Sequence, residues 1–312
     1  MSEAPTPKLS IVTTIFHSEN YLERFLTQLY QALVEIECDS FEVIFVNDGS
    51  PDDSLQLLLG LKQSYPEIVI LELSRNFGHH HAALAGLGYS RGELVFIIDC
   101  DLEVSPLVLK DFHQRKLESS ADVIYGYQTQ RKGNWFEQFS GSLYWRLFNA
   151  LSDTNVPPDL TTARIMTREY VDAVVKLGDR NLFLAGMYHW VGFEQEGIPI
   201  STTAREGKST YSLPKKIKLF VNSITSFSAY PLQLIFYLGM SITAFSFLLA
   251  LLLIIQRLLL PEMLLTGWTS LAVFMSLSLG IVTTCIGVIG IYLSRVYSQT
   301  QNRPLYYIKN IY

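Results

Sequence analysis

The chain has 312 residues, and its 24 Lys and Arg against 29 Asp and Glu give a formal net charge of −5. This acidic balance, with no basic patch carrying interleaved aromatics before residue 210, excludes an electrostatic nucleic-acid binder. The three cysteines, Cys38, Cys100 and Cys285, have no paired spacing, which argues against a disulfide framework or a zinc site and fits a reducing cytosol.

Apolar segments of two kinds alternate in the first half of the chain. Short β-branched runs predict strands, and apolar residues at helical spacing predict helices between them. The predicted strands are residues 9–15, 41–46, 68–73 and 94–98, and another starts at 122–125. One predicted helix begins near residue 18, and another covers residues 79–90. Strands and helices that alternate in this way indicate an α/β fold with a doubly wound sheet.

The stretch that organises the chain is LVFIIDCDLEVSP, residues 94–106. An apolar run that ends in a turn predicts a buried parallel strand, and open α/β sheets bind ligands at the carboxyl ends of their strands. The Asp-x-Asp pair Asp99 and Asp101, followed by Glu103, falls at that end. Because crowded carboxylates repel one another, we expect Mg²⁺ or Mn²⁺ among them, together with the phosphates of a nucleoside diphosphate. A simple loop or helix cap is the alternative interpretation.

Two later stretches, residues 219–256 and 263–294, contain no charged residue. Each exceeds the ~20 residues that cross a hydrocarbon core of ~30 Å. We therefore expect two transmembrane helices, about 232–255 and 265–293, in a membrane segment of residues 230–294.

The residues around these spans predict their orientation. Residues 213–229 place three lysines beside apolar side chains, which predicts an amphipathic helix along the membrane interface; the alternative is that they begin the first span. After the spans come Arg295, Arg303 and Lys309, and between them lies Arg257. The positive-inside rule then predicts an inner- or plasma-membrane, multi-pass protein whose termini, including a tail of residues 295–312, are cytoplasmic. The polar N-terminus lacks a signal-peptide pattern, so we expect the domain after it to stay in the cytosol.

Four motifs follow one another in order: SIVTTIFHSENYL, FEVIFVNDGSPDDS, SRNFGHHHAAL and IIDCDLEVSP. With the REGKSTYS segment and two spans after them, they resemble the family 2 glycosyltransferases with a GT-A nucleotide-sugar domain. More narrowly, the chain is similar to the polyprenyl-phosphate glycosyltransferases, which include dolichol-phosphate mannose synthases and bacterial undecaprenyl-phosphate glucosyltransferases. The resemblance covers almost the whole chain and implies a cytosolic GT-A domain at residues 1–212 before the amphipathic helix and the membrane hairpin.

The resemblance also implies a reaction. It is an inverting transfer of a hexose, with glucose from UDP-glucose favoured, to a polyprenyl phosphate such as undecaprenyl phosphate, with Mg²⁺ or Mn²⁺ as cofactor. The alternatives are UDP-GlcNAc or GDP-mannose as donor, a non-catalytic membrane scaffold, and a lipid-sugar transporter subunit. A processive polysaccharide synthase is disfavoured because a Gln-x-x-Arg-Trp signature and further spans are not found. The small residues Gly280, Gly287 and Gly290 would allow association into a homo-oligomer.

The resemblance assigns roles to individual residues. The nucleotide-sugar set is Thr14, Phe16, Ser18, Asp48, Gly78, Asp99 and Cys100; the metal set is Asp99, Asp101 and Glu103; the catalytic set is Asp101, Arg131, Arg205 and Lys208; and the acceptor-phosphate set is Arg131, Arg205, Ser209 and Tyr211. Phe16 would stack on the base, Asp48 would bind base or ribose, and Asp101 with the metal would stabilise the departing diphosphate. The alternatives are core packing for Phe16, a solvated side chain for Glu103, and surface charge for the basic residues.

The chain departs from the family pattern at two positions. Gln128 stands where relatives often carry a second arginine, which removes one cation. Thr162 stands where an Asp often precedes the first Arg of TTARIMTR, so no general base is assigned. A lipid phosphate is already ionised near neutral pH, with a second pKa of about 6, and therefore depends less on a base than a hydroxyl acceptor does.

Three consecutive histidines, His79, His80 and His81, invite a metal interpretation. Neighbouring helix positions point about 100° apart, so the three rings cannot converge on one ion. Instead, the loop at residues 75–78 and the helix start are expected to approach the nucleotide, where free backbone N–H groups favour anions.

Overall fold

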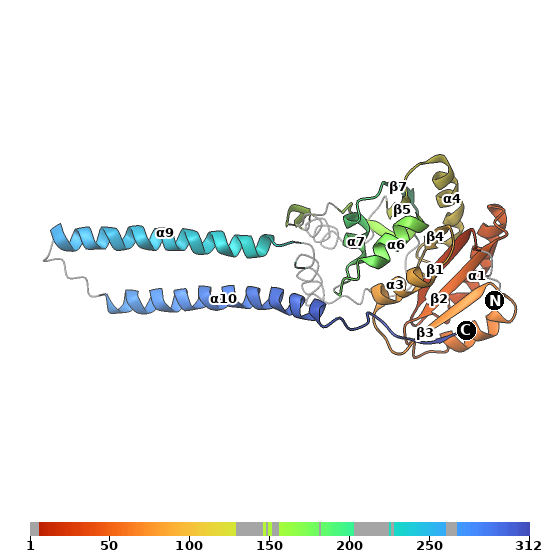
Figure 1. The fold of residues 1–312 in the computed structure, drawn as a ribbon, viewed down its shortest axis with the longest axis horizontal. Helices are drawn as coiled ribbons and strands as arrows, with labels where there is room; N and C mark the ends of the chain where they lie inside the picture. The colour runs from red at the N-terminus through yellow and green to blue at the C-terminus, as the bar shows by residue number, and fades with distance from the viewer. Residues whose placement is uncertain are drawn as a thin grey trace.

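The computed structural model describes residues 6–128, 146–147, 149–151, 156–180, 182–202, 225, 228–259 and 267–312. Both ends of the chain lie at an α/β domain, and two long helices project from that domain (Figure 1). The α/β domain contains the strand ends at which the sequence predicts a site.

An eight-stranded sheet of order β7-β5-β6-β4-β1-β2-β3-β8 forms the centre of the domain. Its strands are β1 (Leu9–Ile15), β2 (Phe41–Asn47), β3 (Ile68–Leu73), β4 (Leu94–Ile97), β5 (Val123–Gln128), β6 (Leu160–Thr167), β7 (Gln195–Ile200) and β8 (Ile308–Ile311). The neighbours β4, β1, β2 and β3 run parallel, whereas β6 and β8 lie antiparallel to β4 and β3. The expectation of a doubly wound sheet is therefore corrected to a mixed sheet, because the chain returns beside the parallel strands in the opposite direction.

Helices cover both faces of this sheet. They are α1 (Leu22–Glu35), α2 (Ser54–Lys62), α3 (His79–Tyr89), the short 3₁₀ helix η1 (Pro106–Val108), α4 (Leu109–Glu118), α6 (Arg168–Lys176) and α7 (Leu184–Trp190). Alternate side chains of a strand point to opposite faces, so Val43 and Phe45 belong to the core under α1, α2 and α4. Ile44 and Val46 belong to the core under α3, α6 and α7. Burial on both faces explains why the strands read as continuous apolar runs.

Helix α3 lies unusually close to the sheet. A Cβ atom on Gly86 would lie 2.4 Å from Val12 Cγ1 and 2.9 Å from Val46 Cγ2, closer than packed atoms approach. The run of small residues in this helix therefore lets α3 contact β1 and β2 directly, which brings its first residue to the carboxyl edge of the sheet.

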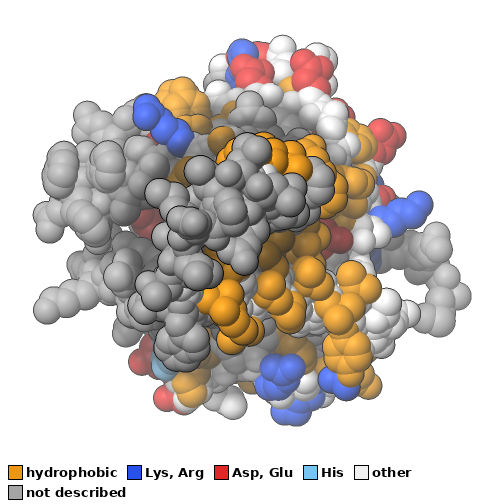
Figure 2. All heavy atoms as spheres, turned by 90° about the vertical axis from the view of Figure 1, so that its left-hand side faces the viewer, with side chains coloured by type: hydrophobic (Ala, Val, Ile, Leu, Met, Phe, Trp, Pro, Cys, Tyr) orange, Lys and Arg blue, Asp and Glu red, His pale blue; other side chains and the backbone are white. Residues whose placement is uncertain are grey.

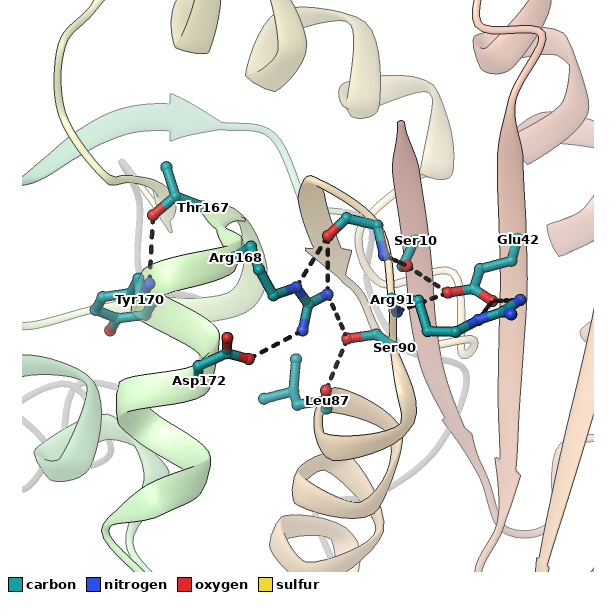
Figure 3. Close-up of polar contacts among 10 residues, drawn as sticks. Ser10, Glu42, Leu87, Ser90, Arg91, Thr167, Arg168, Tyr170 and Asp172 are labelled. Carbon is teal, nitrogen blue, oxygen red and sulfur yellow. Dashed lines mark hydrogen bonds and ion pairs between the residues drawn. The ribbon is translucent and has the colours of Figure 1, made fainter. Parts of the chain in front are cut away.

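The amino edge of the sheet is closed by a polar network (Figure 3). Buried Glu42 on β2 accepts hydrogen bonds from Ser10 Oγ (2.6 Å), the Arg91 backbone N–H (2.8 Å) and Arg91 Nη2 (3.0 Å). Arg168, at the start of α6, donates to the Gly92 carbonyl at 3.0 and 2.9 Å and to Ser90 Oγ at 3.0 Å. These contacts tie β1, β2, the loop before β4 and α6 together.

The last residues of the chain add an edge strand that the sequence did not predict. Residues 295–312 were expected to form a tail, but β8 pairs antiparallel with β3. Glu72 on β3 accepts hydrogen bonds from Lys309 Nζ (2.7 Å), Asn310 Nδ2 (2.6 Å) and the Tyr312 hydroxyl (2.9 Å). The end of the chain is thus fixed to the domain at a sequence distance of more than 200 residues.

The long helices α9 (Tyr230–Leu259) and α10 (Trp268–Thr300) run side by side away from the domain (Figure 1). Their hydrophobic side chains are exposed and gather around the hairpin in the view of Figure 2. By length and composition, Ser278–Thr300 is the one stretch of the described residues that could cross a membrane, and Tyr230–Ile242 is a shorter apolar helix. The side chains of several residues in the remainder of the first predicted span, residues 243–255, are not described. Most of the predicted helix at 213–229 lies outside the described residues.

Replacing Glu42 with Ala should lower the free energy of unfolding by about 3 kcal/mol, because it leaves the buried Ser10 hydroxyl and the Arg91 backbone N–H without their acceptor. Urea denaturation followed by circular dichroism measures this change. Lys110→Ala, which removes the exposed pair with Glu35 (3.1 Å), is the control and should have a much smaller effect. Equal effects of the two substitutions would contradict a structural role for the Glu42 network.

Candidate active site

A cleft of about 840 Å³ opens at the carboxyl ends of β1, β2 and β4. Asp101 lines this cleft. So does every residue of the predicted nucleotide-sugar set, which is Thr14, Phe16, Ser18, Asp48, Gly78, Asp99 and Cys100. These residues converge because β4, β1 and β2 are parallel neighbours, so that their last residues meet at one edge. The structure brings the predicted set together, and the role of each member stays a prediction.

The turn after β1 presents Phe16 to the cleft. The Phe16 side chain is 46% exposed, which rules out core packing as its explanation. Its backbone N–H donates to the Ser18 hydroxyl at 3.2 Å, and the Ser18 N–H donates to Ser54 Oγ at 3.1 Å. His17 between them has a φ of 55° and is held in this left-handed conformation while its N–H donates to Ser50 Oγ (2.8 Å). An aromatic face held open in this way could stack on a base.

Asp48 joins the end of β2 to the loop after β3. Its carboxylate oxygens accept the backbone N–H groups of Phe77 (2.7 Å) and Gly78 (2.9 Å). Burial raises the pKa of Asp48 above its usual range, and these two hydrogen bonds together with the nearby His81 and His79 oppose the rise. Asp48 therefore positions the start of α3, a role that the sequence did not predict; binding of a base or ribose by Asp48 stays a prediction.

Gly49 allows this loop to approach β2. Its φ is 64°, and a Cβ atom on it would lie 2.7 Å from the backbone C of Arg75 and the backbone N of Asn76. Only a residue without a side chain fits both the conformation and the space. The NDGS sequence thus combines the carboxylate that holds the loop with the glycine that leaves room for it.

The three predicted metal ligands border a recess of about 180 Å³ beside the cleft, and Gln128 and Thr162 line it as well. Asp101 Oδ1 accepts the Glu103 N–H at 3.1 Å, while Leu102 between them has a φ of 58°, a conformation that branched residues rarely adopt. Asp99, Asp101 and Glu103 offer hard oxygen donors. Among the described residues, no group of three or more His, Cys, Asp or Glu is arranged to hold a metal ion.

Cys100 lies between the two aspartates but is buried. Its thiol donates to the Thr14 carbonyl oxygen at 3.3 Å, and burial raises the pKa of this thiol to about 12. A neutral thiol is neither a nucleophile nor a metal ligand. Cys100 is better explained as a contact that holds the end of β4 against the end of β1.

His79 also lines the cleft, although the sequence analysis gave its side chain no role. Its ring lies between Thr14 and Asp99, whereas the His80 ring lies 3.0 Å from the Leu182 carbonyl oxygen. The sequence signal for His79 was its position directly after Gly78, at the start of a helix that follows a strand. Such a helix begins at the carboxyl edge of the sheet, where the cleft lies. The predicted residues Arg131, Arg205, Lys208, Ser209 and Tyr211 lie outside the described residues.

The sequence of this chain is similar to sequences of known proteins. Residues 10–175 match the family described as Glycosyl transferase family 2. A Mycobacterium tuberculosis (strain CDC 1551 / Oshkosh) protein described among glycosyltransferases is 40% identical over 98% of this chain and 88% of its own length. The uncharacterized glycosyltransferase YkcC of Bacillus subtilis (strain 168) is 33% identical over 97% of this chain and 94% of its own. The bactoprenol glucosyl transferase of Shigella phage SfV is 30% identical over 97% of this chain and 98% of its own.

The chain therefore belongs to glycosyl transferase family 2, and it is a glycosyltransferase with a GT-A-like α/β nucleotide-sugar-binding fold. The family predicted from the four sequence motifs is confirmed.

Gly49→Ala should lower the free energy of unfolding by about 1–3 kcal/mol, because the new Cβ atom displaces the loop that Asp48 holds. Urea denaturation measures this change. Gly60→Ala in α2, where a Cβ atom would meet nothing within 4 Å, is the control and should not destabilise the protein. An unchanged free energy of unfolding in Gly49→Ala would contradict the close approach of this loop to β2.

The free energy of unfolding should decrease as the pH is lowered, because burial lowers the pKa of His80. The unfolded chain takes up this proton near pH 6.5 and the folded chain only at lower pH, so the stabilisation is complete above about pH 6.5 and is lost as pH falls through the folded value. Urea denaturation at pH 7.5 and 5.5 should show a smaller decline in His80→Gln than in the wild type. Identical declines would assign the effect to other groups.

Proposed function

We propose that the protein transfers glucose from UDP-glucose to a polyprenyl phosphate, with inversion at the anomeric carbon, at the cytosolic face of a membrane. The observation that carries this proposal is the cleft with an exposed aromatic ring in the turn after β1 and a pair of aspartates after β4. A nucleoside diphosphate needs an apolar face for its base and a cation to compensate the charge of its diphosphate. Phe16 offers the apolar face, and the aspartates offer oxygen ligands for a divalent cation at the same sheet edge.

Asp99 and Asp101 are the proposed contacts to ribose and metal-bridged diphosphate. Their oxygen donors fit Mg²⁺ or Mn²⁺, which in such sites is held by one or two carboxylates plus substrate phosphates. Glu103, which borders the same recess, would add a further donor. A bound divalent cation supplies Lewis-acid stabilisation of the leaving diphosphate. The protein's own part is to orient the donor so that its anomeric carbon faces the acceptor.

The proposed acceptor is a phosphate on a lipid. The ionised phosphate oxygen attacks the anomeric carbon, the bond to UDP breaks, and the product is a lipid-linked phosphosugar. A general base is less necessary for such an acceptor, which fits Thr162 at a position where relatives often have Asp. Arg131, Arg205, Lys208, Ser209 and Tyr211 are the proposed phosphate contacts, from segments outside the described residues.

A membrane position is proposed from α9 and α10. The exposed apolar side chains of both helices, the flanking lysines and arginines, and the name of the bactoprenol relative all support a two-helix anchor with a cytosolic catalytic domain. The corresponding division is a catalytic domain of residues 1–212, an interfacial helix of 213–229, a hairpin of 230–294 and a C-terminal segment of 295–312. An anchored site raises the effective concentration of a lipid acceptor. Homo-oligomer formation through the open glycine face of α10 belongs to the same proposal.

Transfer of radiolabel to undecaprenyl phosphate tests the proposal directly. Purified protein is incubated with UDP-glucose, UDP-GlcNAc or GDP-mannose, and the lipid fraction is counted with and without EDTA. We expect EDTA-sensitive transfer from UDP-glucose, reduced about 100-fold or more by Asp101→Ala. Asp111→Ala, an exposed aspartate in the first turn of α4, is the control and should retain activity.

Each other outcome has a definite meaning. Transfer from UDP-GlcNAc or GDP-mannose alone would replace the proposed sugar and keep the reaction class. Full activity of Asp101→Ala would remove the proposed catalytic site. UDP-sugar binding without transfer from any donor by the folded protein would favour a membrane scaffold.

A further inference from the structure

His79 lies across the mouth of the cleft between two strand ends. It is the first residue of α3, after Gly78 with a φ of 98°. Its Nδ1 lies 3.0 Å from Thr14 Oγ1 on β1, and its Nε2 lies 3.7 Å from Asp99 Oδ1 after β4. Both ring nitrogens thus face polar atoms that belong to the proposed donor site.

The two ring contacts differ in length. The 3.0 Å between Nδ1 and Thr14 Oγ1 is a hydrogen-bond distance, whereas the 3.7 Å between Nε2 and Asp99 Oδ1 is longer than a hydrogen bond and within the range of an ion pair. In the tautomer with its N–H on Nε2, toward the carboxylate, Nδ1 accepts the hydrogen of the Thr14 hydroxyl. The Thr14 contact therefore sets the orientation of the ring, and the ring's other edge faces Asp99.

The Asp99 side chain follows the end of β4 and is 39% exposed. A carboxylate in that position can rotate between several orientations. With Oδ1 toward His79, the second oxygen is left for the ribose or the cation that the donor brings. The ring itself lines the same cleft and is 43% exposed, so it restricts Asp99 without closing the site.

We infer that His79 is a positioning residue for Asp99 in binding a nucleoside-diphosphate sugar. This inference rests on the proposed function. His79 acts through its Nε2 edge, and Thr14 supports it from the other side. The partners of metal-site ligands typically contribute 10–100-fold to affinity, and we expect an effect of that size here.

Two substitutions of His79 test its contacts to Asp99 and Thr14 separately, because each new side chain mimics one edge of the imidazole. The amide of His79→Gln can reach the place of Nε2 and donate to Asp99, whereas the shorter amide of His79→Asn reaches only the place of Nδ1, beside Thr14. Calorimetric titration of each folded variant with UDP in the presence of Mn²⁺ gives the affinity. Relative to the wild type, we expect about 10–100-fold weaker binding for His79→Ala and His79→Asn, and recovery to within about threefold for His79→Gln.

His113→Ala is the control, because this histidine lies on α4 and does not line the cleft. It should bind UDP like the wild type. Wild-type affinity in His79→Ala would overturn the inference, and so would equal losses in the Gln and Asn variants, since the Gln side chain keeps the contact to Asp99 and the Asn side chain keeps only the contact to Thr14. Failure of the wild-type protein itself to bind UDP with Mn²⁺ would instead overturn the proposed function, so the two failures are distinguishable.

Discussion

The hydrogen bonds from the Phe77 and Gly78 backbone to the carboxylate of Asp48 are the contacts on which the cleft depends. They fix the loop after β3 against the end of β2 and set where α3 begins. Gly49 provides the space for this approach, and the small residues of α3 continue it along the sheet. The position of His79, and hence the wall of the cleft that faces Asp99, follows from this one junction.

The two edges of the sheet divide stability and function between them. At the amino edge, Glu42 and Arg168 are engaged in a dense set of hydrogen bonds that closes the structure. At the carboxyl edge, Phe16 and the aspartates after β4 line the cleft, and residues such as His17 and Leu102 keep left-handed conformations.

The parallel half of the fold could be predicted because its signals are local. Apolar runs located β1, β2 and β3 to within a residue, and the Asp-x-Asp motif follows β4 and lines the cleft, as its position after an apolar run predicts. The mixed character of the sheet and the strand β8 could not be predicted, since pairing of Glu72 with Lys309 joins segments that no local pattern relates. For the same reason, the contacts of Asp48 and His79 became visible only when three strand ends were brought together.

A crystal structure of the protein grown with UDP and Mn²⁺, with the anomalous signal of manganese recorded, tests the central claim most directly. The account predicts a manganese ion in contact with a carboxylate oxygen of Asp101 and with the diphosphate, and the uracil against the exposed ring of Phe16. UDP and manganese bound away from the ends of β1 and β4 would contradict it.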